Sequence, residues 1–86
     1  MKYFTYILKS LKDDKRYIGH TGDLAVRLKF HNAGLNPSTK NRRPLVIICF
    51  KKFETKLEAD HYERYLKKLK GGKQLEIEIK NMQTPL

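Results

Sequence analysis

Five side chains of this sequence are of types that can cut a phosphodiester bond: Tyr6, Tyr17, Arg27, His31 and Glu63. Such a cut needs an activated oxygen, positive charge on the phosphate and usually a divalent cation held by a carboxylate. Histidine can move protons near neutral pH, arginine carries a permanent planar charge, and glutamate is an oxygen ligand for Mg²⁺. Each residue alone has an ordinary structural explanation. Whether they form a catalytic site depends on the strands and helices that carry them.

The two tyrosines lie on segments that are predicted to be neighbouring strands. Residues 2–9 are rich in aromatic and β-branched types and nearly continuous in apolarity, which is typical of a strand buried on both faces. A polar turn at 11–15 leads to a second short strand, 16–19, and the two form a hairpin. Gly19 ends this strand, where the backbone must bend or come close to another group. A third apolar strand is predicted at 45–51, also buried.

Two helices are predicted to carry the other candidates. Asp23 can cap a helix that runs from Leu24 to about Asn32. Arg27 and His31 are four residues apart, so they share a face of it. Residues 55–58 form a capping box that starts the second helix. The polar segment 35–43 between them is predicted to be a basic loop.

Glu63 lies within the apolar stripe of the second helix, between Ala59 and Leu66. A carboxylate on an inward-facing stripe is costly unless it is paired, binds a metal or opens onto a cleft. Gly71 and Gly72 stop this helix. The apolar pattern of the tail from residue 73 is compatible with a strand or a helix. We predict a short helix that is followed by a frayed end at 83–86.

The charge of the chain predicts a polyanionic partner. Nineteen Lys and Arg against nine Asp and Glu give a net charge of +10 over 86 residues, which form one domain spanning 1–86. Nucleic acid is favoured over a membrane, because no helix joins a basic face to a long exposed apolar one. The lone cysteine, Cys49, is predicted to be a core residue in a protein of the reducing cytoplasm. The nucleic-acid-binding candidates are His20, Lys40, Arg42, Arg43, Lys67 and Lys68.

The order of these segments resembles the GIY-YIG nuclease superfamily, in particular its small single-domain bacterial members. The resemblance rests on Tyr6, on the intact Tyr17-Ile18-Gly19, on the helix that carries Arg27 and His31, and on Glu63 after the third strand. It covers roughly residues 2–73. It implies an α/β (α+β) fold with a small three-stranded, mainly antiparallel sheet flanked by helices.

The resemblance also implies a role for each candidate. Tyr17 is the expected general base and Tyr6 a supporting group, and Arg27 binds the scissile phosphate. His31 or His20 assists as a base or an orienting group. Glu63 holds one Mg²⁺ or Mn²⁺ ion, with waters and phosphate oxygens completing its shell.

Three functions remain open on the sequence. The first is a metal-dependent nuclease acting on DNA rather than RNA, in repair or recombination. The second is a nucleic-acid-binding module that keeps the nuclease fold without catalysis. The third is an adaptor that recruits a larger repair or recombination enzyme. A fold supports many functions, so the site must discriminate between them.

Overall fold

The computed structural model describes residues 2–85, which form a three-stranded sheet and three α-helices. Strands β1 (Tyr3–Ser10) and β2 (Arg16–Thr21) are followed by helix α1 (Leu24–Asn32) and a single 3₁₀ turn, η1 (Lys40–Arg42). Strand β3 (Leu45–Phe53), helix α2 (Lys56–Lys68) and helix α3 (Lys73–Asn81) complete the order. The predicted α+β fold with an antiparallel sheet and flanking helices is confirmed.

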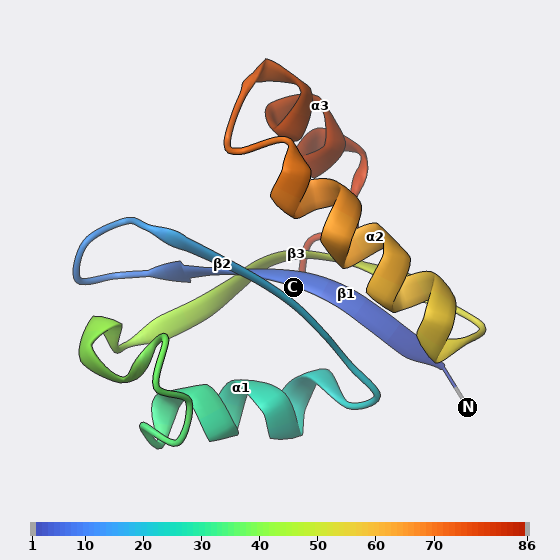
Figure 1. Ribbon diagram of the computed structural model, residues 1–86. Coiled ribbons are helices and arrows are strands. Elements are labelled where there is room, and N and C mark those ends of the chain that lie inside the picture. The colour runs from blue at the N-terminus through green and yellow to red at the C-terminus, as the bar shows by residue number, and fades with distance from the viewer. Residues whose placement is uncertain (1, 86) are drawn as a thin grey trace.

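The central strand of the sheet is β1, which pairs antiparallel with β2 on one side and β3 on the other. Figure 1 shows α1 on one face of the sheet and α2 with α3 on the other. Because both faces are covered, the central run of β1 from Thr5 to Leu8 is buried at every position. Side chains alternate along the strand, so Tyr6 and Leu8 face α1, whereas Thr5 and Ile7 face α2 and α3.

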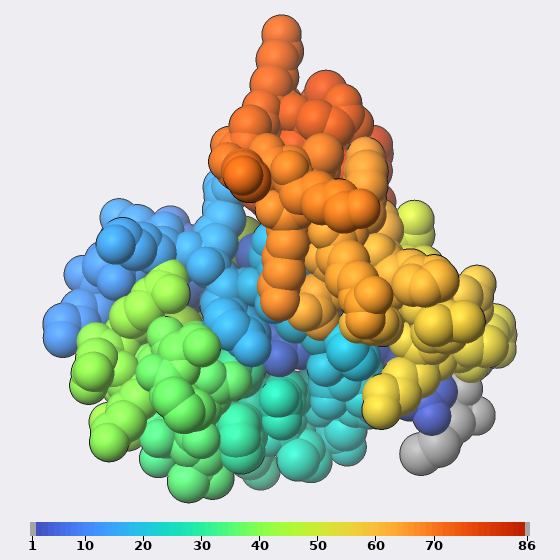
Figure 2. All heavy atoms as spheres, viewed as in Figure 1, coloured from blue at the N-terminus to red at the C-terminus, as the bar shows by residue number. Residues whose placement is uncertain are grey.

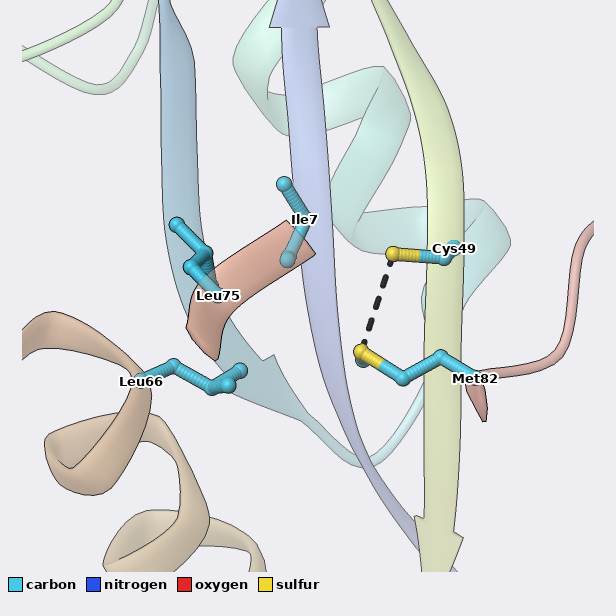
Figure 3. Packing of buried hydrophobic residues seen from close by; sticks show 5 residues of the cluster. All are labelled: Ile7, Cys49, Leu66, Leu75 and Met82. Carbon is cyan, nitrogen blue, oxygen red and sulfur yellow. Dashed lines mark hydrogen bonds between the residues drawn. The ribbon is translucent and has the colours of Figure 1, made fainter. Parts of the chain in front are cut away.

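The larger hydrophobic core lies between the sheet and the pair α2 and α3. Ile7, Cys49 and Leu66 are fully buried there, with Leu75 and Met82 closing the cluster from the C-terminal segment (Figure 3). The Cys49 thiol lies 3.7 Å from the Met82 sulfur, and burial raises the pKa of that thiol to about 11. Cys49 is therefore a core side chain, as the sequence predicts.

Local signals in the sequence account for both ends of α1 and for the start of α2. The Asp23 carboxylate accepts a hydrogen bond from the Val26 amide at 3.0 Å, which caps α1. Gly34 follows α1 at a φ of 79°, a conformation that favours glycine. The predicted capping box of Thr55 and Glu58 is complete at the start of α2.

Three details differ from the sequence prediction. Strand β3 is an edge strand rather than a strand buried on both faces, and Val46 and Lys51 are exposed on it. Strand β2 does not end at Gly19 but continues to Thr21. The predicted fraying does not begin at Gln83, because Gln83 and Phe50 exchange backbone hydrogen bonds of 2.8 and 2.9 Å; Leu86 lies outside the described residues. No helix within residues 2–85 is long and apolar enough to cross a bilayer.

Candidate active site

A buried chain of hydrogen bonds joins β1, α1 and the loop before β3. The Tyr6 hydroxyl lies 3.1 Å from Nε2 of His31, and Nδ1 of His31 lies 2.8 Å from the Thr39 hydroxyl. Tyr6 is 1% exposed, and His31 and Thr39 are fully buried. A hydroxyl can donate or accept, so either neutral tautomer of His31 satisfies both bonds. The imidazole of His31 is thus held on each side by a hydroxyl group that can donate or accept a hydrogen bond.

Tyr17 lies beside this chain but is more open to solvent. Its ring centroid is 4.9 Å from that of His31 and 6.5 Å from that of Tyr6. Its hydroxyl accepts a long hydrogen bond of 3.4 Å from the Asn36 side-chain amide. Tyr17 is half-buried, whereas Tyr6 is enclosed, so of the two hydroxyls that of Tyr17 is the more accessible to a substrate.

Arg27 brings positive charge to the same cluster. Its guanidinium lies over the Phe30 ring at 4.5 Å from the centroid, which orients the planar group. The Nε atom of Arg27 is buried and has no hydrogen-bond partner among residues 2–85. A buried donor of this kind is costly without a partner, so it is suited to an anionic oxygen that arrives from outside.

The pKa values of the two buried groups move in directions that keep both neutral. Burial raises the pKa of the Tyr6 hydroxyl, and the hydrogen bond and charge of Arg27 oppose part of that rise. Negative charge on Tyr17, and to a smaller extent on Glu63, adds to the rise. Burial, with the charge of Arg27, lowers the pKa of His31. His31 is therefore neutral near pH 7.

Gly19 makes room for Tyr6 across the hairpin. The strand register places Gly19 opposite Tyr6, with both on the face that α1 covers. A Cβ atom at Gly19 would lie 2.6 Å from the Tyr6 hydroxyl oxygen and 3.2 Å from the Tyr17 ring. The sequence prediction that the backbone comes close to another group at Gly19 is confirmed, and that group is the Tyr6 side chain.

Glu63 lies on α2 and faces the opposite side of β2. One of its carboxylate oxygens is 2.6 Å from Nδ1 of His20, and the other accepts a 2.5 Å hydrogen bond from Lys67. The Asp60 carboxylate is 3.9 Å from the same histidine nitrogen. Figure 2 shows the atoms around the end of β2 against the yellow and orange atoms of α2.

These three side chains have the chemistry of a divalent-cation site. His20, Asp60 and Glu63 each offer one ligand atom, and these atoms all lie within 4.8 Å of one another. Within residues 2–85 they are the one group of three such side chains that gathers so closely. Carboxylate oxygens suit Mg²⁺ and Mn²⁺, and an imidazole nitrogen suits Mn²⁺ and the later transition metals. The residues present therefore fit the cation that the sequence predicts.

The five catalytic candidates thus form two groups on the two faces of an edge strand. Tyr6, Tyr17, Arg27 and His31 are together on the face of α1. Glu63 reaches the site from the other face, where His20 accompanies it. Alternation along β2 causes this division, because Tyr17 and His20 point to opposite faces of the strand.

The predicted nucleic-acid-binding residues differ in how firmly the protein holds them. Arg43 folds back, with its Nε donating to the Lys40 carbonyl at 2.8 Å and its guanidinium against Gly34. Arg42 lies 3.4 Å from Asp13 and donates to the Arg16 carbonyl. Lys40 and Lys68 are exposed on the surface, as is Lys67, which pairs with Glu63.

Sequence reasoning missed three residues of the site: Asn36, Thr39 and Asp60. Asn36 and Thr39 belong to the basic loop, and no periodic pattern relates them to the rings that they contact. Asp60 had a usable signal, because it precedes Glu63 by three residues on a helix and the two therefore share a face.

The buried imidazole makes the stability of the fold dependent on pH. His31 has a lowered pKa in the folded state, so below about pH 6.5 the unfolded chain binds the proton more readily. We expect the free energy of unfolding to fall from pH 7 to pH 5, by about 1.4 kcal/mol for each unit of pKa difference. Urea unfolding at both pH values measures it. His31→Gln should flatten this dependence and exposed His61→Gln should not; equal slopes in wild type and His31→Gln would contradict it.

The chain is similar to a known protein family and to several known proteins. The GIY-YIG catalytic domain matches residues 2–77. The UPF0213 protein YazA of Bacillus subtilis is 45% identical over 80 residues, which cover 91% of this chain and 80% of that protein. A UPF0213 protein of Clostridium perfringens is 40% identical over 75 residues, covering 86% and 80%. The solution NMR structure of a UPF0213 protein from Bacillus halodurans superposes with a TM-score of 0.54 at 29% identity, covering 94% and 84%.

Proposed function

This chain belongs to the GIY-YIG catalytic domain family, and on that premise we propose that it hydrolyses phosphodiester bonds in DNA with one bound Mg²⁺ or Mn²⁺ ion. The observation that carries the proposal is the meeting of Tyr6, Tyr17, Arg27 and His31 in one cluster. These residues come from two strands and a helix, so chain proximity does not account for their meeting.

Each member of the cluster has a part that its surroundings support. Arg27 binds the scissile phosphate, because its charge is permanent and its buried Nε has no hydrogen-bond acceptor within residues 2–85. Tyr17 holds or accepts the proton of the attacking water, because its hydroxyl is the more accessible one. Neutral His31, which is itself bonded to Thr39, holds the Tyr6 hydroxyl in place. Tyr6 in turn orients the attacking water beside Tyr17.

Glu63 is the residue that would hold the cation. When bound, the cation supplies positive charge to a phosphate oxygen and lowers the pKa of a bound water. The carboxylate of Glu63 is only 14% exposed, so its present hydrogen bonds to His20 and Lys67 orient it firmly. The Lys67 pair lies at the surface and is the weaker of the two.

The partner of this site is nucleic acid, and we infer DNA. The net charge of +10 gives association that salt weakens strongly. Lys40 and Lys68 are exposed and available to a phosphate backbone. We place the protein in the cytoplasm, where a buried lone thiol stays reduced, and in repair or recombination with a larger enzyme as partner.

Cleavage assays test the proposal directly. Purified protein is incubated with plasmid, branched DNA and RNA in Mg²⁺, Mn²⁺ or EDTA. We expect metal-dependent cleavage of DNA, and a loss of at least about 100-fold in Glu63→Gln. Glu54→Gln, which removes an exposed carboxylate before α2, serves as the control. No cleavage by the wild type, or equal cleavage by Glu63→Gln and the wild type, would refute the proposal.

A second function, binding without catalysis, is favoured by one observation. Both oxygens of Glu63 already have partners, so the carboxylate is satisfied without a cation. A binding module or adaptor would hold DNA with an affinity that falls with salt and would need no metal. Its Glu63→Gln variant would bind DNA as tightly as the wild type. Gel-shift titrations of Glu63→Gln and wild type in EDTA measure this binding, and the cleavage assay in Mg²⁺ or Mn²⁺ distinguishes the two functions.

A further inference from the structure

We propose that the cation is held directly by three protein ligands, His20 Nδ1 and the carboxylates of Asp60 and Glu63, and that this site therefore prefers Mn²⁺ and similar transition metals to Mg²⁺. The inference deepens the proposed function, which requires only Glu63. It concerns metal binding by the protein itself, without nucleic acid.

The geometry supports three ligands rather than one. The His20 nitrogen is 2.6 Å from Glu63 and 3.9 Å from Asp60, and all three ligand atoms lie within 4.8 Å of one another. A cation with bonds of about 2.0–2.2 Å to nitrogen and oxygen fits between atoms at such separations after small side-chain movements. Asp60 and Glu63 are three residues apart on α2, and His20 faces them from β2, so the backbone already gathers the ligands.

The protein holds these side chains in place but leaves a way in. The side chains of His20, Asp60 and Glu63 are 23%, 26% and 14% exposed. A hollow of about 520 Å³ is lined by two of them, His20 and Asp60, together with Lys56 and Leu57. The remaining positions around a cation would face this hollow, where water or a phosphate oxygen can complete the shell.

Two positively charged side chains, Arg64 and Lys67, already pair with these carboxylates and would compete with a metal ion for them. Arg64 contacts Asp60 at 3.1 Å and Lys67 contacts Glu63 at 2.5 Å, each one helical turn further along α2. Their side chains are 70% and 52% exposed, so each can swing into solvent when a metal ion takes the carboxylate. They also offset the negative charge of the group in the absence of metal.

The imidazole ligand determines the preference among metals. Mg²⁺ takes oxygen ligands and retains most of its waters, whereas Mn²⁺, Co²⁺ and Zn²⁺ accept imidazole nitrogen readily. A site with one nitrogen and two carboxylate ligands should bind Mn²⁺ more tightly than Mg²⁺ by at least on the order of tenfold.

Titration of the tag-free full chain with Mn²⁺, followed by the electron paramagnetic resonance signal of the free ion, tests the proposal without DNA. We expect one Mn²⁺ per chain, with affinity at least about tenfold weaker in His20→Asn, Asp60→Asn and Glu63→Gln. His20→Asn is informative because its side-chain amide can still donate to Glu63 where Nδ1 does, which preserves the fold. His61→Asn, next to Asp60 and exposed, is the matched control.

Each outcome decides the matter. If only Glu63→Gln weakens Mn²⁺ binding, or if the wild type binds none at millimolar Mn²⁺, the three-ligand site is refuted, while DNA cleavage still tests the proposed function separately. If all three variants lose the ion and His61→Asn does not, the site is established even when the wild type cuts no DNA. Circular dichroism of each variant confirms that it is folded.

Discussion

Replacing Arg27 with glutamine is expected to slow DNA cleavage about 100- to 1,000-fold, which corresponds to about 2.7–4 kcal/mol of transition-state stabilisation. The guanidinium lies over Phe30 and acts on Tyr6, and its buried Nε has no partner within residues 2–85. Glutamine keeps a polar side chain at this position but removes the charge that would meet the phosphate. Single-turnover cleavage with excess enzyme measures the effect on the chemical step.

The matched control for this variant is Lys29→Gln. Lys29 lies on the same helix, is exposed, and its loss changes the net charge by the same amount. We expect Lys29→Gln to weaken DNA binding slightly and to leave the single-turnover rate unchanged. Equal losses of that rate in both variants would show that Arg27 contributes only general attraction for DNA, and the assigned role would then be wrong.

The second large effect is expected at Gly19. An alanine there places a methyl group 2.6 Å from the Tyr6 hydroxyl oxygen and 2.8 Å from the carbon that bears it. Tyr6 is 1% exposed and bonded to His31, so its ring cannot move aside cheaply. Overpacking of this kind costs about 1–3 kcal/mol, and we expect Gly19→Ala to reduce the free energy of unfolding by that amount.

Urea unfolding measures this loss, and Gly22→Ala is its control. Gly22 lies three residues further along, and a Cβ atom there would meet only the Tyr3 ring, at 3.8 Å. That distance is ordinary contact, so the control should stay within about 0.5 kcal/mol of wild type. A Gly19→Ala variant as stable as Gly22→Ala would mean that Tyr6 is not fixed above Gly19.

Much of the fold could be predicted because the strongest signals are local. The cap at Asp23, the capping box at Thr55 and the apolar run of β1 each depend on a few adjacent residues. The same local spacing placed Arg27 and His31 on one helix face. The prediction of a short C-terminal helix is also confirmed by α3.

The rest depends on contacts between distant residues. The loop before β3 is held by the Asn32 side chain, which bonds both backbone groups of Leu45, and by the Ser10 hydroxyl, which donates to the Arg42 carbonyl. Thr39 lies within this loop, and its contact with His31 links residues eight apart in the sequence. The position of β3 at the edge likewise follows from pairing order, which its apolar composition does not reveal.

The backbone pairing of Gln83 with Phe50 has a consequence for how the protein behaves on its partner. A chain this basic accumulates on a polyanion, and crowded molecules with open sheet edges can join edge to edge into aggregates. The C-terminal segment occupies the outer edge of β3 at Phe50, and exposed Lys51 and Lys52 follow directly. The paired C-terminal segment and these two charged side chains therefore protect this edge of the sheet from pairing with the edge strand of another copy.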